Sequence, residues 1–118
     1  MSIRELREAL VSINAHYGAP NPASVDAVEA IPLLEATADA AAAAAFSVIP
    51  SWVTDIPAWL MDDHYPPCPV TAQYERLWNV AHLSHMRALM WRGVDRVDAG
   101  RAAALWLGET MVYLDLSA

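Results

Sequence analysis

All eight prolines of the chain fall between residues 20 and 69, and the two ends, residues 1–19 and 70–118, contain none. Proline inside a helix removes a backbone hydrogen bond and clashes with the preceding turn, so long uninterrupted helices are expected only at the two ends. No segment alternates apolar and polar residues over the length of a strand. The sequence therefore predicts an all-α fold: a compact bundle of about five helices, with short, proline-punctuated helices in the middle.

The size and apolar content of the chain are those of one folded domain. It has 118 residues, of which 56% are hydrophobic, enough to bury a core without disulfides. We expect a single helical domain over residues 1–118. The lone Cys68 cannot form an intrachain disulfide, early charges argue against a secretory signal, and no uncharged run is long enough to cross a bilayer. These features predict a cytoplasmic protein without a membrane segment.

The first helix is predicted to run from Ile3 to Tyr17. Ser2 and Glu5 form the S-x-x-E pattern of a capping box, and Gly18 is well placed to end the helix with a positive φ. After a proline loop, a short turn over residues 24–30 is expected. Apolar residues repeat along the first helix at helical spacing: Ile3, Leu6, Leu10, Ile13 and Tyr17.

Prolines set the expected boundaries in the middle of the chain. Pro32 suits the first turn of a second helix that reaches about Val48 and includes an alanine run. A short helix around residues 57–63 should follow, and residues 65–69 should be extended because prolines crowd them.

The last two helices have clear start and stop signals. The fourth helix is predicted over Thr71–Arg92, with Thr71 as its cap and Gly93 as the residue that stops it. Asp98 is expected to cap a final helix that ends near Leu116.

The final helix carries more apolar residues than one face can hold. One stripe contains Ala102, Leu105, Trp106, Val112, Tyr113 and Leu116, and a second contains Ala103, Leu107, Met111 and Leu114. A helix that is apolar nearly all round is either central or shared with a partner. The alternatives are a tightly wrapped bundle or an exposed patch, and the latter would form a homo-oligomer such as an isologous dimer.

Charge is unevenly distributed along the chain, whose formal net charge is −7. Residues 8–75 contain nine acidic residues and no lysine or arginine, whereas the remaining segments are close to neutral. Direct binding of nucleic acid is disfavoured, because phosphate contacts need clustered basic residues. A basic surface on another protein would instead be attracted.

Residues 52–63 interleave large apolar side chains with acids, a composition typical of binding hot spots. The alternative is that Trp52 and Trp59 plug the core, the commoner place for large aromatic side chains. The residues predicted to bind a protein partner are Glu35, Asp39, Trp52, Asp55, Ile56, Trp59, Asp62 and Asp63.

A second hypothesis concerns a metal site. His82 and His85 are three residues apart on the expected fourth helix, and His64 and Cys68 flank a proline loop that could fold over them. Zinc accepts such nitrogen and sulfur ligands. The spacing matches no standard zinc motif, and half-buried histidines without metal are the simpler alternative.

No sequence motif predicts a reaction or a cofactor. There is no glycine-rich phosphate loop, nucleophile elbow or HExxH helix. The sequence therefore favours a non-enzymatic acidic module that docks on the basic, nucleic-acid-binding surface of a larger protein as an inhibitor or regulator. A phage or mobile-element inhibitor of a bacterial defence nuclease complex, such as an anti-CRISPR, is one protein of this kind. A homo-oligomeric helical protein and a small metal-binding protein are the alternatives.

Overall fold

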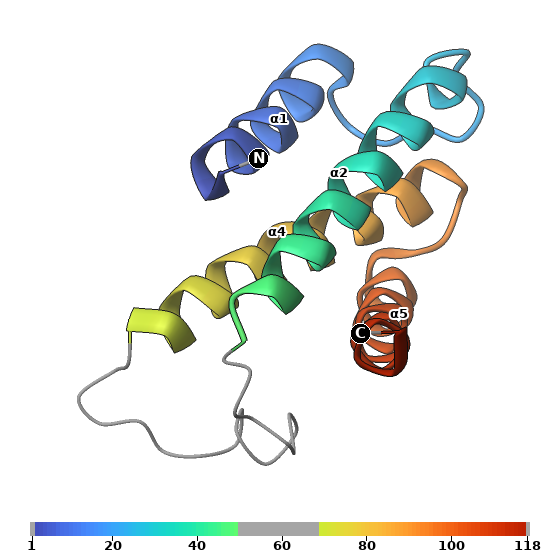
Figure 1. The fold of residues 1–118 in the computed structure, drawn as a ribbon. Coiled ribbons are helices and arrows are strands. Elements are labelled where there is room, and N and C mark those ends of the chain that lie inside the picture. The colour runs from blue at the N-terminus through green and yellow to red at the C-terminus, as the bar shows by residue number, and fades with distance from the viewer. Residues whose placement is uncertain (1, 50–68, 118) are drawn as a thin grey trace.

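The computed structural model describes residues 2–49 and 69–117, which contain four helices and no strand (Figure 1). They are α1 (Ile3–Tyr17), α2 (Ala27–Ser47), α4 (Pro69–Trp91) and α5 (Arg96–Ser117). The all-α prediction is confirmed for this part of the chain. The short helix expected around residues 57–63 and the extended residues 65–68 lie outside the described residues. None of the described helices has a stretch long and apolar enough to span a bilayer.

Helix α1 has the predicted bounds and the predicted cap. The Ser2 hydroxyl accepts a hydrogen bond of 3.2 Å from the backbone N–H of Glu5, satisfying one of the free donors at the helix start. Gly18 ends the helix at a φ of 71°, and its N–H donates to the Asn14 carbonyl. Leu6 and Leu10 are buried on the side that faces the other helices.

Helix α2 begins at Ala27, five residues before the predicted start, and runs through Pro32 without a break. The prediction that Pro32 opens the helix, after a separate short turn, is wrong. Proline has no N–H to bond the carbonyl of Val28, four residues earlier, and Val28 lies on the exposed side of the helix. That carbonyl can therefore be hydrated, so the helix tolerates the proline.

Helices α2 and α4 lie antiparallel and share the largest interface of the described structure (Figure 1). Small side chains let their backbones approach closely. The buried residues of α2 are Ala27, Ala30, Leu34, Thr37, Ala38, Ala41, Ala42 and Ala45. Those of α4 include Tyr74, Leu77, Ala81, Ser84, Ala88 and Trp91, spaced alternately by three and four residues. This spacing keeps one stripe of α4 in the interface along its length.

Helix α4 starts at Pro69 rather than at Thr71, so Thr71 lies inside the helix and Pro69 is not part of an extended segment. Proline is well suited to the first helical position because its missing N–H would have no helical partner there. The predicted end is confirmed to within a residue. Gly93 has a φ of 97°, and the N–H of Val94 returns to the carbonyl of Leu89 in a Schellman-type arrangement.

Helix α5 is capped by Asp95, not by Asp98. One Asp95 carboxylate oxygen accepts hydrogen bonds from the backbone N–H groups of Val97 and Asp98, at 2.9 and 3.2 Å. Asp98 therefore lies in the first turn. In Figure 1, α5 is seen almost end-on while α2 and α4 lie across the view, so it crosses the α2–α4 pair steeply. Its buried residues are Ala99, Ala103, Leu107 and Met111.

Candidate functional site

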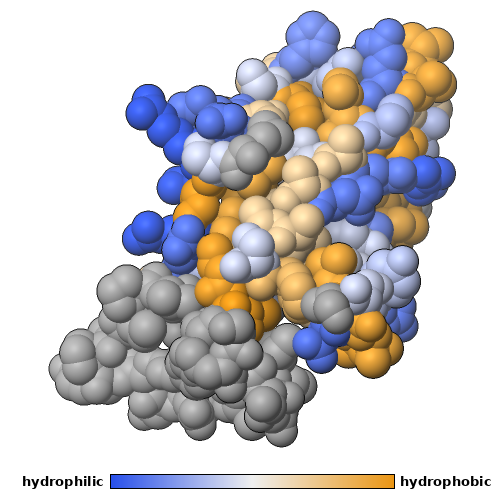
Figure 2. All heavy atoms as spheres, in the orientation of Figure 1, coloured by the Kyte–Doolittle hydropathy of each residue, from blue (hydrophilic) through white to orange (hydrophobic). Residues whose placement is uncertain are grey.

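The outer surface of α2 is an apolar ridge with carboxylates along both flanks. Its large exposed apolar residues are Val28 and Leu33 on α2 and Val25 just before the helix, which are 78%, 47% and 84% exposed. Figure 2 shows a pale orange band of weakly hydrophobic residues across the middle of the molecule, along the line of α2, with blue polar side chains beside it. The carboxylates come from α2 and the residue before it: Asp26, Glu29, Glu35 and Asp39. We call these residues together the α2 outer surface.

Two of the predicted partner-binding residues lie on one flank of the α2 outer surface. Glu35 Oε1 accepts a charge-assisted hydrogen bond of 2.6 Å from Arg92 at the end of α4. One arginine from outside the acidic segment thus neutralises one of its carboxylates. Asp39 is exposed and has no ion-pair partner among the described residues. The other predicted residues, Trp52, Asp55, Ile56, Trp59, Asp62 and Asp63, lie outside the described residues.

The opposite flank of the α2 outer surface contacts α1 through Tyr17. The Tyr17 hydroxyl donates a hydrogen bond of 3.1 Å to Glu29 Oε2. Desolvation raises the pKa of Tyr17 above its usual value, and the hydrogen bond to Glu29 and the negative charges of Glu29 and Asp26 raise it further. The carboxylates on this flank therefore create a negative potential that disfavours deprotonation of the neighbouring Tyr17 hydroxyl.

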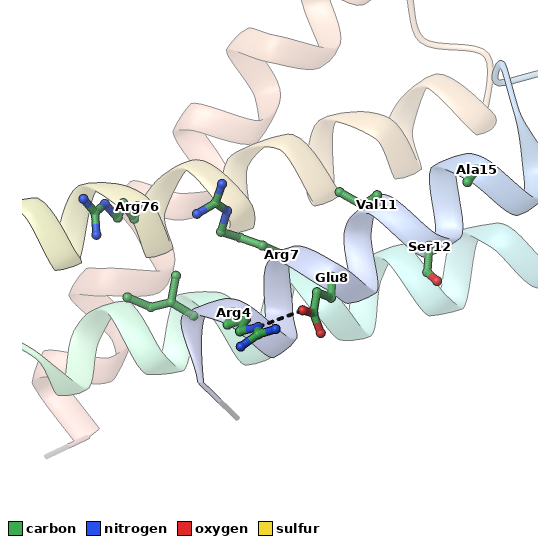
Figure 3. Close-up of a pocket in the computed structure, with 8 residues that line it drawn as sticks. Arg4, Arg7, Glu8, Val11, Ser12, Ala15 and Arg76 are labelled. Carbon is green, nitrogen blue, oxygen red and sulfur yellow. Dashed lines mark hydrogen bonds and ion pairs between the residues drawn. The ribbon is translucent and has the colours of Figure 1, made fainter.

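A groove of about 760 Å³ runs along α1 and is bounded by Arg76 of α4. In Figure 3, Arg7 and Arg76 come from different helices and extend to the same side, while Arg4 turns away to pair with Glu8 at 3.0 Å. No carboxylate of the described residues pairs with Arg7 or Arg76. No local sequence pattern predicts this groove, because Arg7 and Arg76 are distant in the chain and only the packing of α1 on α4 brings them together.

The predicted histidine pair lies between α4 and α5. His82 stacks on Trp78 of its own helix, with ring centroids 4.9 Å apart, and its Nε2 is 3.0 Å from the Gly100 carbonyl. In that hydrogen bond Nε2 is the donor, so it carries the proton. His85 stacks on Trp106 of α5. Burial lowers the pKa of His85 below its usual value, although the nearby charges of Glu35 and Asp39 oppose the shift.

The metal hypothesis stays a prediction. His64 and Cys68 lie outside the described residues, and within residues 2–49 and 69–117 no three His, Cys, Asp or Glu side chains are grouped to hold an ion. The contacts of His82 and His85 give both rings a role in packing α5 on α4. A ligand set that used both rings would need His82 to coordinate through Nδ1.

Helix α5 has a second exposed surface that is largely apolar. The stripe expected at Ala103, Leu107 and Met111 is buried, whereas most of the other predicted stripe faces outward. Five large apolar side chains of α5 are more than half exposed: Val97, Leu105, Val112, Tyr113 and Leu116. Orange side chains also gather over α5 at the lower right of Figure 2. Of the two alternatives, the described residues therefore show an exposed apolar patch, and it lies mainly on α5.

The chain matches no protein-family model, no curated protein and no solved structure at a significant level.

Proposed function

We propose that this protein is a non-enzymatic protein-binding module that docks its α2 outer surface on a basic surface of a larger protein. The observation that carries the proposal is the composition of that surface: exposed Val25, Val28 and Leu33 are interspersed with the carboxylates of Asp26, Glu29 and Asp39. Protein interfaces combine exposed apolar side chains with polar and charged ones in this way. These carboxylates would steer a basic partner and fix its orientation.

Two features of the acidic segment support a partner from outside the chain. Residues 8–75 contain no lysine or arginine, and of the basic residues described elsewhere only Arg92 forms an ion pair with this segment across helices. The charges of Asp26 and Asp39 are therefore available to another molecule. Where the partner surface normally holds nucleic acid, the bound module would compete for it. We propose this inhibitory action, as in a phage or mobile-element protein directed at a defence nuclease complex.

The experiment that tests this proposal is charge reversal on the α2 outer surface. Asp26→Lys combined with Asp39→Lys reverses two exposed charges that form no side-chain hydrogen bond among the described residues. Glu75→Lys combined with Glu109→Lys is the matched control, because it changes the net charge equally on α4 and α5, where both residues are exposed. Proteins captured from a native lysate by the wild type would be identified by mass spectrometry and their affinities measured at several salt concentrations.

The proposal predicts that the α2 variant loses the captured protein and flattens the salt dependence, whereas the control variant binds within a few-fold of the wild type. Equal losses in both variants would mean that only the total charge matters. Unchanged binding by the α2 variant would show that another surface makes the contact. Either result rejects the α2 outer surface as the docking site.

A further inference from the structure

Helix α5 leaves an apolar face without a partner among the described residues. Its inner stripe packs on the α2–α4 pair, and its opposite side carries Leu105, Val112 and Leu116, which are 65%, 60% and 81% exposed. These three residues are spaced by seven and four positions along the helix, so they form one continuous strip. A strip of large apolar side chains on one exposed helix face is typical of a helix that packs against another helix.

Gly108 lies in the middle of this face. Nothing in the described structure requires a glycine at this position. Its φ is not positive, and a Cβ added there would meet nothing within 4 Å. Glycine in a helix interior is destabilising relative to alanine. Ala104 and Gly108 instead form a shallow depression with Leu105, Glu109 and Val112 on its sides. Small residues at this position allow the backbone of a second helix to approach closely.

Two opposite charges, one toward each end of this face, are placed so that each can meet the other in a second copy. Arg101 lies two turns before Gly108, and Asp115 lies two turns after it; both are exposed, and neither forms an ion pair among the described residues. If two α5 helices pack antiparallel about Gly108, Arg101 of each copy lies beside the partner's Asp115. The same register places Leu105 within one residue of the level of the partner's Val112. A parallel arrangement would instead place each charge beside its like.

We propose that α5 is the interface of an isologous homodimer, in which two α5 helices pack antiparallel about Gly108. The partner that covers the apolar face is thus a second copy of this chain. The face is self-complementary, because it carries both the depression with its flanking apolar residues and the two opposite charges. This inference uses a different helix face from the α2 outer surface and does not depend on the docking function proposed above.

The dimer should be of moderate affinity. A single pair of helix faces buries less than the roughly 800 Å² per partner of a standard interface, so we expect a micromolar dissociation constant. Sedimentation equilibrium of the tag-free full chain should therefore show a monomer–dimer equilibrium at tens of micromolar. A strict monomer throughout this range would overturn the proposal. The apolar face would then be covered by a different protein or by another part of the chain.

Charge variants test the register. Arg101→Glu and Asp115→Arg should each weaken dimerisation roughly tenfold, because each creates two like-charge contacts per dimer. The double variant restores opposite charges and should recover an affinity close to that of the wild type. Losses that simply add in the double variant would overturn the pairing of Arg101 with the partner's Asp115. Circular dichroism of each variant shows that the exposed substitutions leave the helices intact.

Cysteine cross-linking tests the direction of packing. In a Cys68→Ser background, Gly108→Cys should form a disulfide between copies under mild oxidation, since the two positions meet near the dimer axis. Val97→Cys is the matched control, because residue 97 lies on the same face but at opposite ends of an antiparallel pair. A disulfide at position 97 as rapid as that at position 108 would indicate parallel packing and overturn the proposed arrangement.

Discussion

The imidazole of His85 on α4 lies flat against the indole of Trp106 on α5, with ring centroids 4.1 Å apart and an interplanar angle of 3°. One and a half turns earlier on α5, the carbonyl of Gly100 accepts a hydrogen bond from His82. These two contacts, made three residues apart on α4, fix how α5 crosses the bundle. The residues that the sequence offered as metal ligands therefore position the helix with the exposed apolar face.

Removing the indole of Trp106 should loosen the attachment of α5. Trp106→Ala deletes a half-buried aromatic side chain and with it the ring that stacks on His85. We therefore expect the free energy of unfolding to fall by about 2–3 kcal/mol. Urea unfolding followed by far-UV circular dichroism measures the change. Trp106→Phe, which keeps an aromatic ring at this position, should recover at least half of the loss. Equal destabilisation by both variants would show that the stack contributes little.

The stability of the protein should decrease in mildly acidic solution. Burial disfavours the protonated form of His85 and lowers its pKa, with His82 and Arg92 reinforcing the shift and Glu35 and Asp39 opposing it. The unfolded chain, whose histidines titrate near about 6.5, takes up this proton more readily than the folded chain. The free energy of unfolding should therefore be highest above about pH 7 and should fall as the pH drops through about 6.5.

The pH effect of His85 can be separated from that of the other histidines. Urea midpoints measured at several pH values should decrease less steeply for His85→Gln than for the wild type, because this substitution removes the group whose pKa is lowered by burial. Identical slopes for the two proteins would contradict the assignment to His85.

The close approach of α2 and α4 should make their interface intolerant of larger side chains. Ala41 is completely buried, so Ala41→Leu must push the two helices apart, and we expect a destabilisation of about 2–3 kcal/mol. Ala43→Leu, two residues away on the exposed side of α2, is the control and should change stability by less than about 0.5 kcal/mol. If both substitutions change stability equally, α2 and α4 are not closely packed at Ala41.

Replacing the proline inside α2 should stabilise the protein. Pro32→Ala restores a backbone donor for the Val28 carbonyl and removes a poor helix former from an exposed position, with an expected gain of about 1–3 kcal/mol. Thermal and urea unfolding both report this gain. A loss of stability would indicate that the proline ring makes a contact that outweighs its cost to the helix.

The ion pair between Glu35 and Arg92 should contribute little to stability despite its short distance of 2.6 Å. Both side chains are substantially exposed, at 42% and 53%, so water and salt screen their attraction. A double-mutant cycle with Glu35→Gln and Arg92→Gln should give a coupling energy of about 0.5 kcal/mol. A coupling energy several times larger would show that the pair is an organising contact of the bundle.

The presence of the described helices and the ends of α1 and α4 could be predicted, because the sequence signals for them are local. The Ser2–Glu5 cap and the positive φ values of Gly18 and Gly93 depend only on residues a few positions apart. The starts of α2, α4 and α5 were misplaced where two local signals competed. In α5, Asp95 and Asp98 both suit a cap, and the structure uses Asp95. In α4, Thr71 suits a cap and Pro69 suits a first turn, and the helix starts at Pro69. In α2, Pro32 suits a first turn, but the helix starts at Ala27 and continues through Pro32.

The sequence by itself determined that this chain forms helices, where most of them lie, and that α5 has apolar residues on two sides, because periodicity and caps act within a few turns. Only the tertiary structure decided which side of α5 is buried. The stripe through Ala99 and Ala103 packs inward and leaves Leu105 and Val112 outside. The pairing of Glu35 with Arg92 and the convergence of Arg7 and Arg76 were likewise decided by packing, because contacts between residues far apart in the chain leave no local pattern.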